Sequence, residues 1–339
     1  MNSRTIRNRI LASILFAVVV YAGLTAYADF QEVANSFGDF QWALLPLILL
    51  VTCGNYALRF VKWEYYLWQV GVRGLKRSDS FLIFFSGLGM VITPGKVGEW
   101  LKSYLLREVH GTPITRSAPI LLAERLTDSL ALMILAAVGV FFFGPEYWWV
   151  VTTIAVGSAI AILVARHRPT AMGLLGLLER IPFVGQFSPR FMELYESTYI
   201  LMNPKTVALM TLLSVGSWFF EVMAFYLTVV GLGVDASVDT LLKSAFILPI
   251  ATLAAAIVVI APGGLGVAEG LLTTLSISLF GLPKGPATVA TVIIRIATLW
   301  FGVAVGLISF GILTRKLAKQ GKRLDATPEE AALAGDPAA

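Results

Sequence analysis

Two acidic and two basic residues stand inside strongly apolar stretches of this sequence. Glu99 recurs as Glu269, and Arg125 recurs as Arg295, each 170 residues further along the chain. An ionisable side chain in an apolar helix is costly unless it faces a wet cavity, a partner or a proton path. These residues therefore either bind a substrate or a coupling proton, or form buried Glu–Arg pairs that fix helix positions.

Each of the two acids follows a short break that interrupts an apolar run. Such a break frees backbone N–H and C=O groups, and the half-helix that follows directs a partial positive charge toward the membrane interior. That helix end can hold an anionic head group. The alternative is that both breaks are coincident kinks. The break residues are Pro94, Gly95 and Gly98 in the first, and Pro262, Gly263, Gly264 and Gly266 in the second.

Further charged residues lie near the first break and in the apolar run that follows it. Lys96 lies within the break and could meet a phosphate or simply extend toward the membrane surface. Glu124 and Asp128 are four residues apart and share a helical face, and Asp128 is also three residues from Arg125. This spacing fits a proton relay and simple packing equally well. Glu221 is a weaker candidate of the same kind.

No pattern in the sequence indicates catalysis or a bound cofactor. The single cysteine, Cys53, lies in an apolar run, and His110 and His167 stand alone in basic segments. The sequence contains no motif for a metal-ligand cluster, a nucleotide-binding loop or a nucleophile elbow. We therefore expect no catalytic residues, no metal and no cofactor, and the protein is not expected to be an enzyme.

The composition indicates an integral membrane protein. Hydrophobic residues make up 57% of the 339 residues and charged residues 14%, and the mean hydropathy is +0.78. The apolar runs are continuous and recur along the chain, which favours membrane helices over a signal peptide or a β-barrel. The formal net charge of +5 sits in a few segments between these runs, so we expect no nucleic-acid binding.

The apolar runs predict an all-α polytopic protein with about six full spans. Basic residues precede the first run and follow the last, so both termini are expected on the cytoplasmic side of the inner membrane. The membrane domain is expected over residues 1–323, and residues 324–339 are expected to be a disordered tail. The predicted spans are 10–28, 42–70, 117–143, 150–165, 206–230 and 287–313.

Two further apolar segments predict re-entrant hairpins. Residues 81–92 would cover only about 18 Å of a roughly 30 Å hydrocarbon core, and the basic residues after the break favour a return to the cytoplasm. Residues 240–281 are too long for one crossing and contain the second break, although 241–261 alone could span. The order span, broken hairpin, span occurs over 42–143 and again over 206–313 with opposite orientation, which predicts an inverted repeat. Residues 170–200 predict an amphipathic helix on the cytoplasmic surface.

Three segments carry a resemblance to a known family: ITPGKVGEWLKSYLL, AERLTDSLAL and APGGLGVAEGLL. Over about residues 10 to 315 the chain resembles the lysylphosphatidylglycerol synthetase transmembrane region, also called flippase-like membrane proteins. In bifunctional members this resemblance implies a membrane half that moves an aminoacylated phospholipid between leaflets and a cytoplasmic half that makes it. A stand-alone member without the synthetase half is expected here. The resemblance then leaves the identity of the transported lipid open, and polyprenyl-linked and hopanoid-type lipids are among the candidates.

The leading functional hypothesis is a flippase-like transporter of a polar or anionic lipid head group. Arg125 and Arg295 would bind phosphate, while Glu99 and Glu269 would bind a cationic group or a coupling proton. The alternative is a non-transporting membrane partner that anchors or presents lipid to a separate biosynthetic enzyme. An intramembrane lipid-modifying enzyme is the third and weakest hypothesis, because the polar residues suggest paired charges rather than an activated nucleophile.

Overall fold

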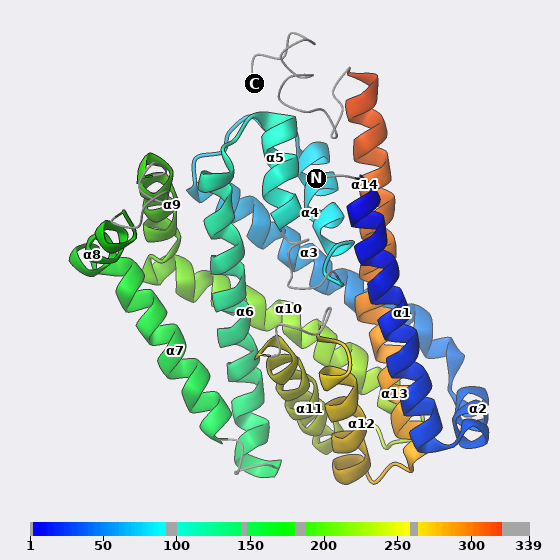
Figure 1. The fold of residues 1–339 in the computed structure, drawn as a ribbon. Helices are drawn as coiled ribbons and strands as arrows, with labels where there is room; N and C mark the ends of the chain where they lie inside the picture. The colour runs from blue at the N-terminus through cyan, green and yellow to red at the C-terminus, as the bar shows by residue number, and fades with distance from the viewer. Residues whose placement is uncertain (1–2, 93–99, 144–147, 180–187, 258–263, 321–339) are drawn as a thin grey trace.

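The structure is a computed structural model that describes residues 3–92, 100–143, 148–179, 188–257 and 264–320 (Figure 1). Across these ranges the secondary structure is helical, with no strand. The predicted all-α class is therefore confirmed. The expected tail at 324–339 lies outside the described residues, as do the first predicted break, within 93–99, and Pro262 and Gly263 of the second break.

Five helical segments in the described part of the chain are long and apolar enough to cross a membrane. They confirm a multi-pass membrane protein, and four of them coincide with predicted spans. The fifth lies in the predicted second hairpin and matches the stretch that could span alone. The segments are Trp42–Gln69, Ile114–Phe143, Pro204–Val230, Val238–Ala256 and Lys284–Lys319.

These segments are built from six α-helices and two short irregular turns of helix. A 3₁₀ turn, Trp42–Leu44, leads into α3, and a π-helical turn, Ile296–Trp300, joins α13 to α14. The α-helices are α3 (Leu45–Gln69), α6 (Ile114–Phe143), α10 (Pro204–Val230), α11 (Val238–Ile257), α13 (Lys284–Arg295) and α14 (Phe301–Lys319).

The first apolar run is followed by a helix that lies between the predicted spans 10–28 and 42–70. Helix α1 (Ser3–Ala28) and helix α2 (Phe30–Asp39) meet at a bend of 96°. Asp29 makes this corner with a φ of 72°, and its carboxylate accepts hydrogen bonds from the backbone N–H groups of Gln31 at 2.8 Å and Glu32 at 3.4 Å. The aspartate thus caps α2 and defines its start.

The short helices lie where the hairpins were predicted. Helices α4 (Arg77–Leu88) and α5 (Leu101–His110) flank the first break, and α12 (Val267–Phe280) follows the second. In Figure 1, α4 and α5 lie at the end of the molecule where α1 begins and α14 ends, whereas α11 and α12 lie at the opposite end. Because the first break and part of the second lie outside the described residues, the re-entrant hairpins and the inverted repeat stay predictions.

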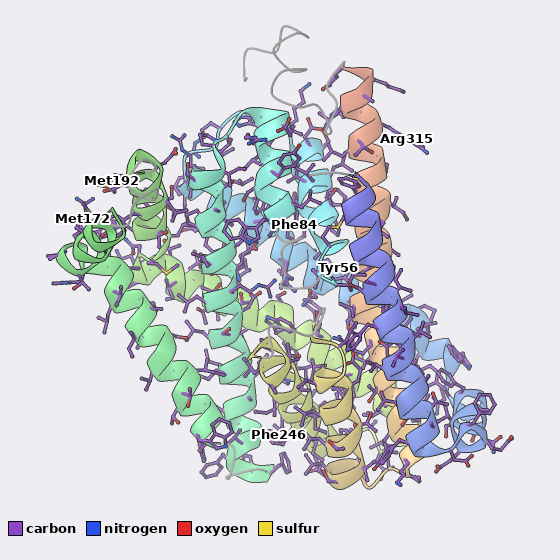
Figure 2. The ribbon with its side chains drawn as sticks, viewed as in Figure 1. Tyr56, Phe84, Met172, Met192, Phe246 and Arg315 are labelled. Carbon is purple, nitrogen blue, oxygen red and sulfur yellow. The ribbon has the colours of Figure 1, made fainter. Side chains whose placement is uncertain are left out.

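A peripheral group of helices lies between the two halves of the sequence. It comprises α7 (Trp148–Arg166), α8 (Arg168–Glu179) and α9 (Ser188–Leu201), which lie to one side of the bundle in Figure 1. The predicted amphipathic segment 170–200 corresponds to α8 and α9, with residues 180–187 outside the described chain. Met172 and Met192 lie on these helices at the outer edge of the molecule in Figure 2 and are both partly exposed. A position on the membrane surface stays a prediction.

Helices α3 and α10 cross the middle of the bundle and join its two halves (Figure 1). Asn55 of α3 donates from Nδ2 to the carbonyl of Ser217 at 2.8 Å, and Ser217 Oγ donates back to the carbonyl of Asn55 at 3.2 Å. Both side chains are buried. This exchange of polar contacts links the two helices through buried side chains, as polar pairs between membrane helices do.

Candidate functional site

A cavity of about 190 Å³ lies between the N-terminal half, α3 to α6, and the C-terminal half, α10 to α14. Space of this size accommodates roughly a dozen water molecules. Tyr56 and Phe84 form part of its wall and lie near the middle of the molecule in Figure 2. Among the described residues, six charged ones also line it: Arg59, Lys102, Glu124, Arg125, Glu221 and Arg295.

Asp128 is the centre of a buried charge cluster beside this cavity. Lys62 Nζ lies 2.6 Å from Asp128 Oδ1, and Arg59 Nη2 lies 3.0 Å from Asp128 Oδ2. Ser214 Oγ donates to Asp128 Oδ1 at 2.9 Å and also lies 2.6 Å from Lys62 Nζ. The cluster therefore joins α3, α6 and α10, and both oxygens of the aspartate are engaged.

Glu124 lies one helical turn before Asp128 and pairs with a different helix. Lys102 Nζ of α5 lies 2.5 Å from Glu124 Oε2, and the same ammonium lies 4.8 Å from the centre of the Trp63 ring. Gly87 makes room for this side chain, because a Cβ at position 87 would lie 2.5 Å from Lys102 Cγ. The pair attaches α5 to α6 at the cavity wall.

The second predicted Glu–Arg pair is present. Arg295 Nε lies 2.6 Å from Glu269 Oε1, and the Glu269 side chain is fully buried. The other oxygen, Oε2, accepts the backbone N–H of Gly266 at 2.6 Å, so Glu269 also caps α12. Gly266 has a φ of 90°, which favours glycine. Glu269 thus accepts one backbone N–H group at the helix end that was expected to bind an anionic head group.

A π-helical turn follows Arg295 and contributes to the same wall. Thr298 lies in this turn, and its carbonyl accepts a hydrogen bond from the Tyr56 hydroxyl at 2.6 Å. Trp300 Nε1 donates to the Tyr21 hydroxyl at 2.9 Å. Such turns are frequent at functional sites because they alter the helical hydrogen-bond pattern. Here the turn brings a backbone acceptor and Arg295 to the cavity.

Of the two described acids that line the cavity, Glu221 is the one without an ion pair to a described basic residue. It lies on α10, three residues after Trp218, and both side chains line the cavity. Among the described residues, no hydrogen bond or ion pair is formed by the Glu221 carboxylate. The charges of Arg59, Arg295 and Asp128 nevertheless act on it. The structure thus gives this weaker sequence candidate a central position.

Several predicted site residues lie outside the described chain. They are Pro94, Gly95, Lys96, Gly98, Glu99, Pro262 and Gly263. The first Glu–Arg pair therefore stays a prediction, whereas Arg125 is placed on the cavity wall together with Gly264 of the second break. Within the described residues, no group of three or more His, Cys, Asp or Glu side chains could hold a metal ion.

Three basic residues of the site were missed in the sequence. Arg59 and Lys62 lie near the end of the predicted span 42–70 beside several aromatic residues, a pattern that is also typical of a cytoplasmic interface. Lys102 is one of the basic residues after the first break, which favour a return to the cytoplasm. The signal for the first two was their spacing of three, which places Arg59 and Lys62 on one helical face together with Tyr66. A single-sequence pattern cannot distinguish such a buried face from an interfacial one, because both combine basic and aromatic residues.

The cavity wall combines guanidinium and ammonium groups with aromatic rings. Arg59 Cζ lies 5.4 Å from the centre of the Trp218 ring, within the range of a cation–π contact. Guanidinium groups bind phosphate oxygens through paired, charge-assisted hydrogen bonds. The arrangement is chemically suited to a small anionic group, with Glu221 as an acid close to it.

Comparison with known proteins identifies related chains. A family model described as the lysylphosphatidylglycerol synthase TM region matches residues 11–306. The glycosyltransferase AglD of Haloferax volcanii is 24% identical over 325 residues, covering 85% of this chain and 52% of that protein. A UPF0104 membrane protein of Methanothermobacter thermautotrophicus is 25% identical over 346 residues, covering 91% of this chain and 93% of that protein. No solved structure matches. The chain thus spans about half of the first relative and nearly all of the second.

Proposed function

Because this chain belongs to the lysylphosphatidylglycerol synthase TM-region family, we propose that it is a flippase-like transporter that moves a polar or anionic lipid head group between leaflets. The observation that carries the proposal is the charged cavity between the two halves of the chain. The head group would occupy this cavity while the acyl chains remain in the bilayer. The role is transport, with no bond made or broken.

The position of the cavity supports this role. Many transporters place the substrate site between two repeats, at helices that are interrupted near the middle of the membrane. Here the cavity wall includes Gly87 at the end of α4, Gly264 of the second break and Ala268 of α12. Segments from both predicted hairpin regions thus line one cavity, and this supports the proposal that two repeats share a site for alternating access.

The positive charges of the wall support an anionic head group as the substrate. Arg59, Arg125 and Arg295 come from three different helices, so a phosphate bound by them would contact both halves of the protein. A charge-assisted contact of this kind in a low-dielectric cavity is stronger than in water. A change in the relative position of the halves would change the phosphate contacts, which is how a ligand can favour one conformation.

We propose the inner membrane as the location, with both termini in the cytoplasm. The start of α1 and the end of α14 lie at the same end of the molecule, as this topology requires (Figure 1). Figure 2 places Arg315 near that end, where Lys316 and Lys319 also lie in the last turn of α14. A cluster of basic residues of this kind is typical of the cytoplasmic side.

Leaflet exchange in proteoliposomes tests the proposal. The purified protein would be reconstituted with fluorescent phosphatidylglycerol, phosphatidylethanolamine or phosphatidylcholine, and dithionite quenching would measure lipid movement. We expect exchange of an anionic lipid that slows at least tenfold in Glu269→Gln and Arg295→Ala. Arg168→Gln is the matched control, because it breaks an exposed pair with Glu196 far from the cavity. If none of the three lipids is exchanged between leaflets, the proposal that the protein transports these lipids is wrong.

A second candidate function is a membrane partner that presents lipid to a separate biosynthetic enzyme. One observation favours it: a relative named as a glycosyltransferase matches this chain over only about half of its length. That longer protein joins a related membrane segment to further sequence. The partner hypothesis predicts a stable complex with a lipid-modifying enzyme in mild detergent and no leaflet exchange by the isolated protein.

A further inference from the structure

We propose that Glu221 takes up one proton when an anionic lipid head group enters the cavity and releases it when the head group leaves. The inference rests on the proposed lipid-transport function and specifies how lipid and proton movement are linked. The proton comes from water in the cavity and binds a carboxylate oxygen of Glu221. No covalent bond of the lipid changes.

Glu221 differs from the other described acids at the site in its contacts. Asp128, Glu124 and Glu269 each have a carboxylate oxygen within 3.0 Å of a basic nitrogen, so protonation would replace an ion pair. Glu221 has no such pair among the described residues, yet it lines the same cavity. It can therefore gain or lose a proton without breaking a contact between helices.

The small volume of the cavity forces the head group to lie close to Glu221. Arg59 and Arg295 attract the head group phosphate, and their charges also act on Glu221. Two negative charges held together at low dielectric repel each other strongly. A phosphodiester stays ionised at neutral pH, so the repulsion is removed when the carboxylate is protonated. Entry of the anion and uptake of the proton are therefore thermodynamically linked.

The groups around Glu221 come from all the helices that pack against α10. Helix α3 contributes Tyr56, Arg59 and Lys62, and α13 contributes Arg295, which binds Glu269. On the cavity side of α11 the wall consists of Thr252, Ala255 and Ala256, none of which is ionisable.

Helix α6 contributes Glu124, Arg125 and Asp128, and Lys102 of α5 is bound to Glu124. No histidine appears among the described residues of the wall. Glu221 is thus the described group placed to exchange a proton as the anion binds.

Proton uptake can be counted directly by calorimetry. Dihexanoyl phosphatidylglycerol would be titrated into the detergent-solubilised full-length protein between pH 5 and 8, in buffers of different ionisation enthalpy. We expect uptake that reaches about one proton per lipid and an affinity that rises by up to tenfold per unit decrease in pH. Glu221→Gln should bind the lipid with no uptake and with little dependence on pH. Glu221→Asp should restore uptake.

Two controls separate this inference from the function on which it rests. Glu269→Gln should still take up a proton on lipid binding, because Glu221 is intact. Uptake that persists in Glu221→Gln would overturn the role of Glu221 while leaving lipid transport in place. If neither dihexanoyl phosphatidylglycerol nor dihexanoyl phosphatidic acid binds the unaltered protein, the proposed function fails for these anionic lipids and this inference fails with it.

Discussion

Lys62 and Asp128 form a 2.6 Å ion pair between α3 and α6, and both side chains are almost completely buried. A second cation, Arg59, reaches the other oxygen of the same aspartate. Removing one member of a buried pair is more costly than removing both, because the remaining charge loses its compensation. Asp128 is the residue on which this part of the bundle most depends.

Asp128→Asn should therefore destabilise the protein by about 3–5 kcal/mol, because Lys62 and Arg59 would keep their charges beside a neutral amide. The thermal unfolding midpoint in detergent would show this loss. Lys243→Ala is the control, because it removes a partly exposed pair with Asp239 within one helix and should cost less than about 1 kcal/mol. Equal midpoints for the two variants would contradict the structural role of Asp128.

A second prediction concerns the packing of α6 on α11. A Cβ at Gly139 would lie 2.3 Å from Cβ of Phe246, a fully buried ring in the far end of the bundle (Figure 2). Gly139→Val should destabilise the protein by about 1–3 kcal/mol through overpacking. Phe246→Ala in the same chain should recover little of that loss, because alanine keeps the Cβ at 2.3 Å and the backbone Cα at 2.9 Å that the new side chain meets. Unfolding midpoints of the single and double variants measure these losses, and a Gly139→Val midpoint equal to that of the unaltered protein would refute the contact.

A third prediction tests the close approach of α4 and α14. A Cβ at Gly306 would lie 2.1 Å from the backbone nitrogen of Gly89, so no side-chain movement can relieve the contact. Gly306→Ala should separate these helices and lower the unfolding midpoint. Gly311 lies on the same helix with nothing within 4 Å of its Cβ position, so Gly311→Ala should be neutral or slightly stabilising. A neutral Gly306→Ala would mean that α4 packs elsewhere.

The sequence predicted most of the helical framework because a membrane span is set by length and apolarity alone. It did not predict α2, whose start depends on the backbone of Asp29 in a conformation that few side chains adopt. The site was predicted unevenly for a similar reason. Glu269 and Arg295 were paired by their repeated spacing, but the partners of Asp128 and Glu124 come from α3 and α5, and such contacts depend on tertiary packing that spacing does not encode.

The last prediction separates the two roles of Glu269. Its Oε2 caps α12 by accepting the N–H of Gly266, and its Oε1 binds Arg295. In Glu269→Gln the amide oxygen can still accept from Gly266, so the cap should survive. Arg295 loses the negative charge that offsets its own, which should lower the unfolding midpoint as for other broken buried pairs, but Arg295 lines the cavity, where water or an anion can compensate its charge. We expect an anionic head group to bind more tightly and leave more slowly, which would lower both the Kd for dihexanoyl phosphatidylglycerol and the rate of leaflet exchange. Glu269→Ala should lose the cap as well, and its unfolding midpoint should fall below that of Glu269→Gln by an amount typical of a lost cap, about 1 kcal/mol. Unchanged affinity in a stable Glu269→Gln would show that Arg295 does not contact the head group.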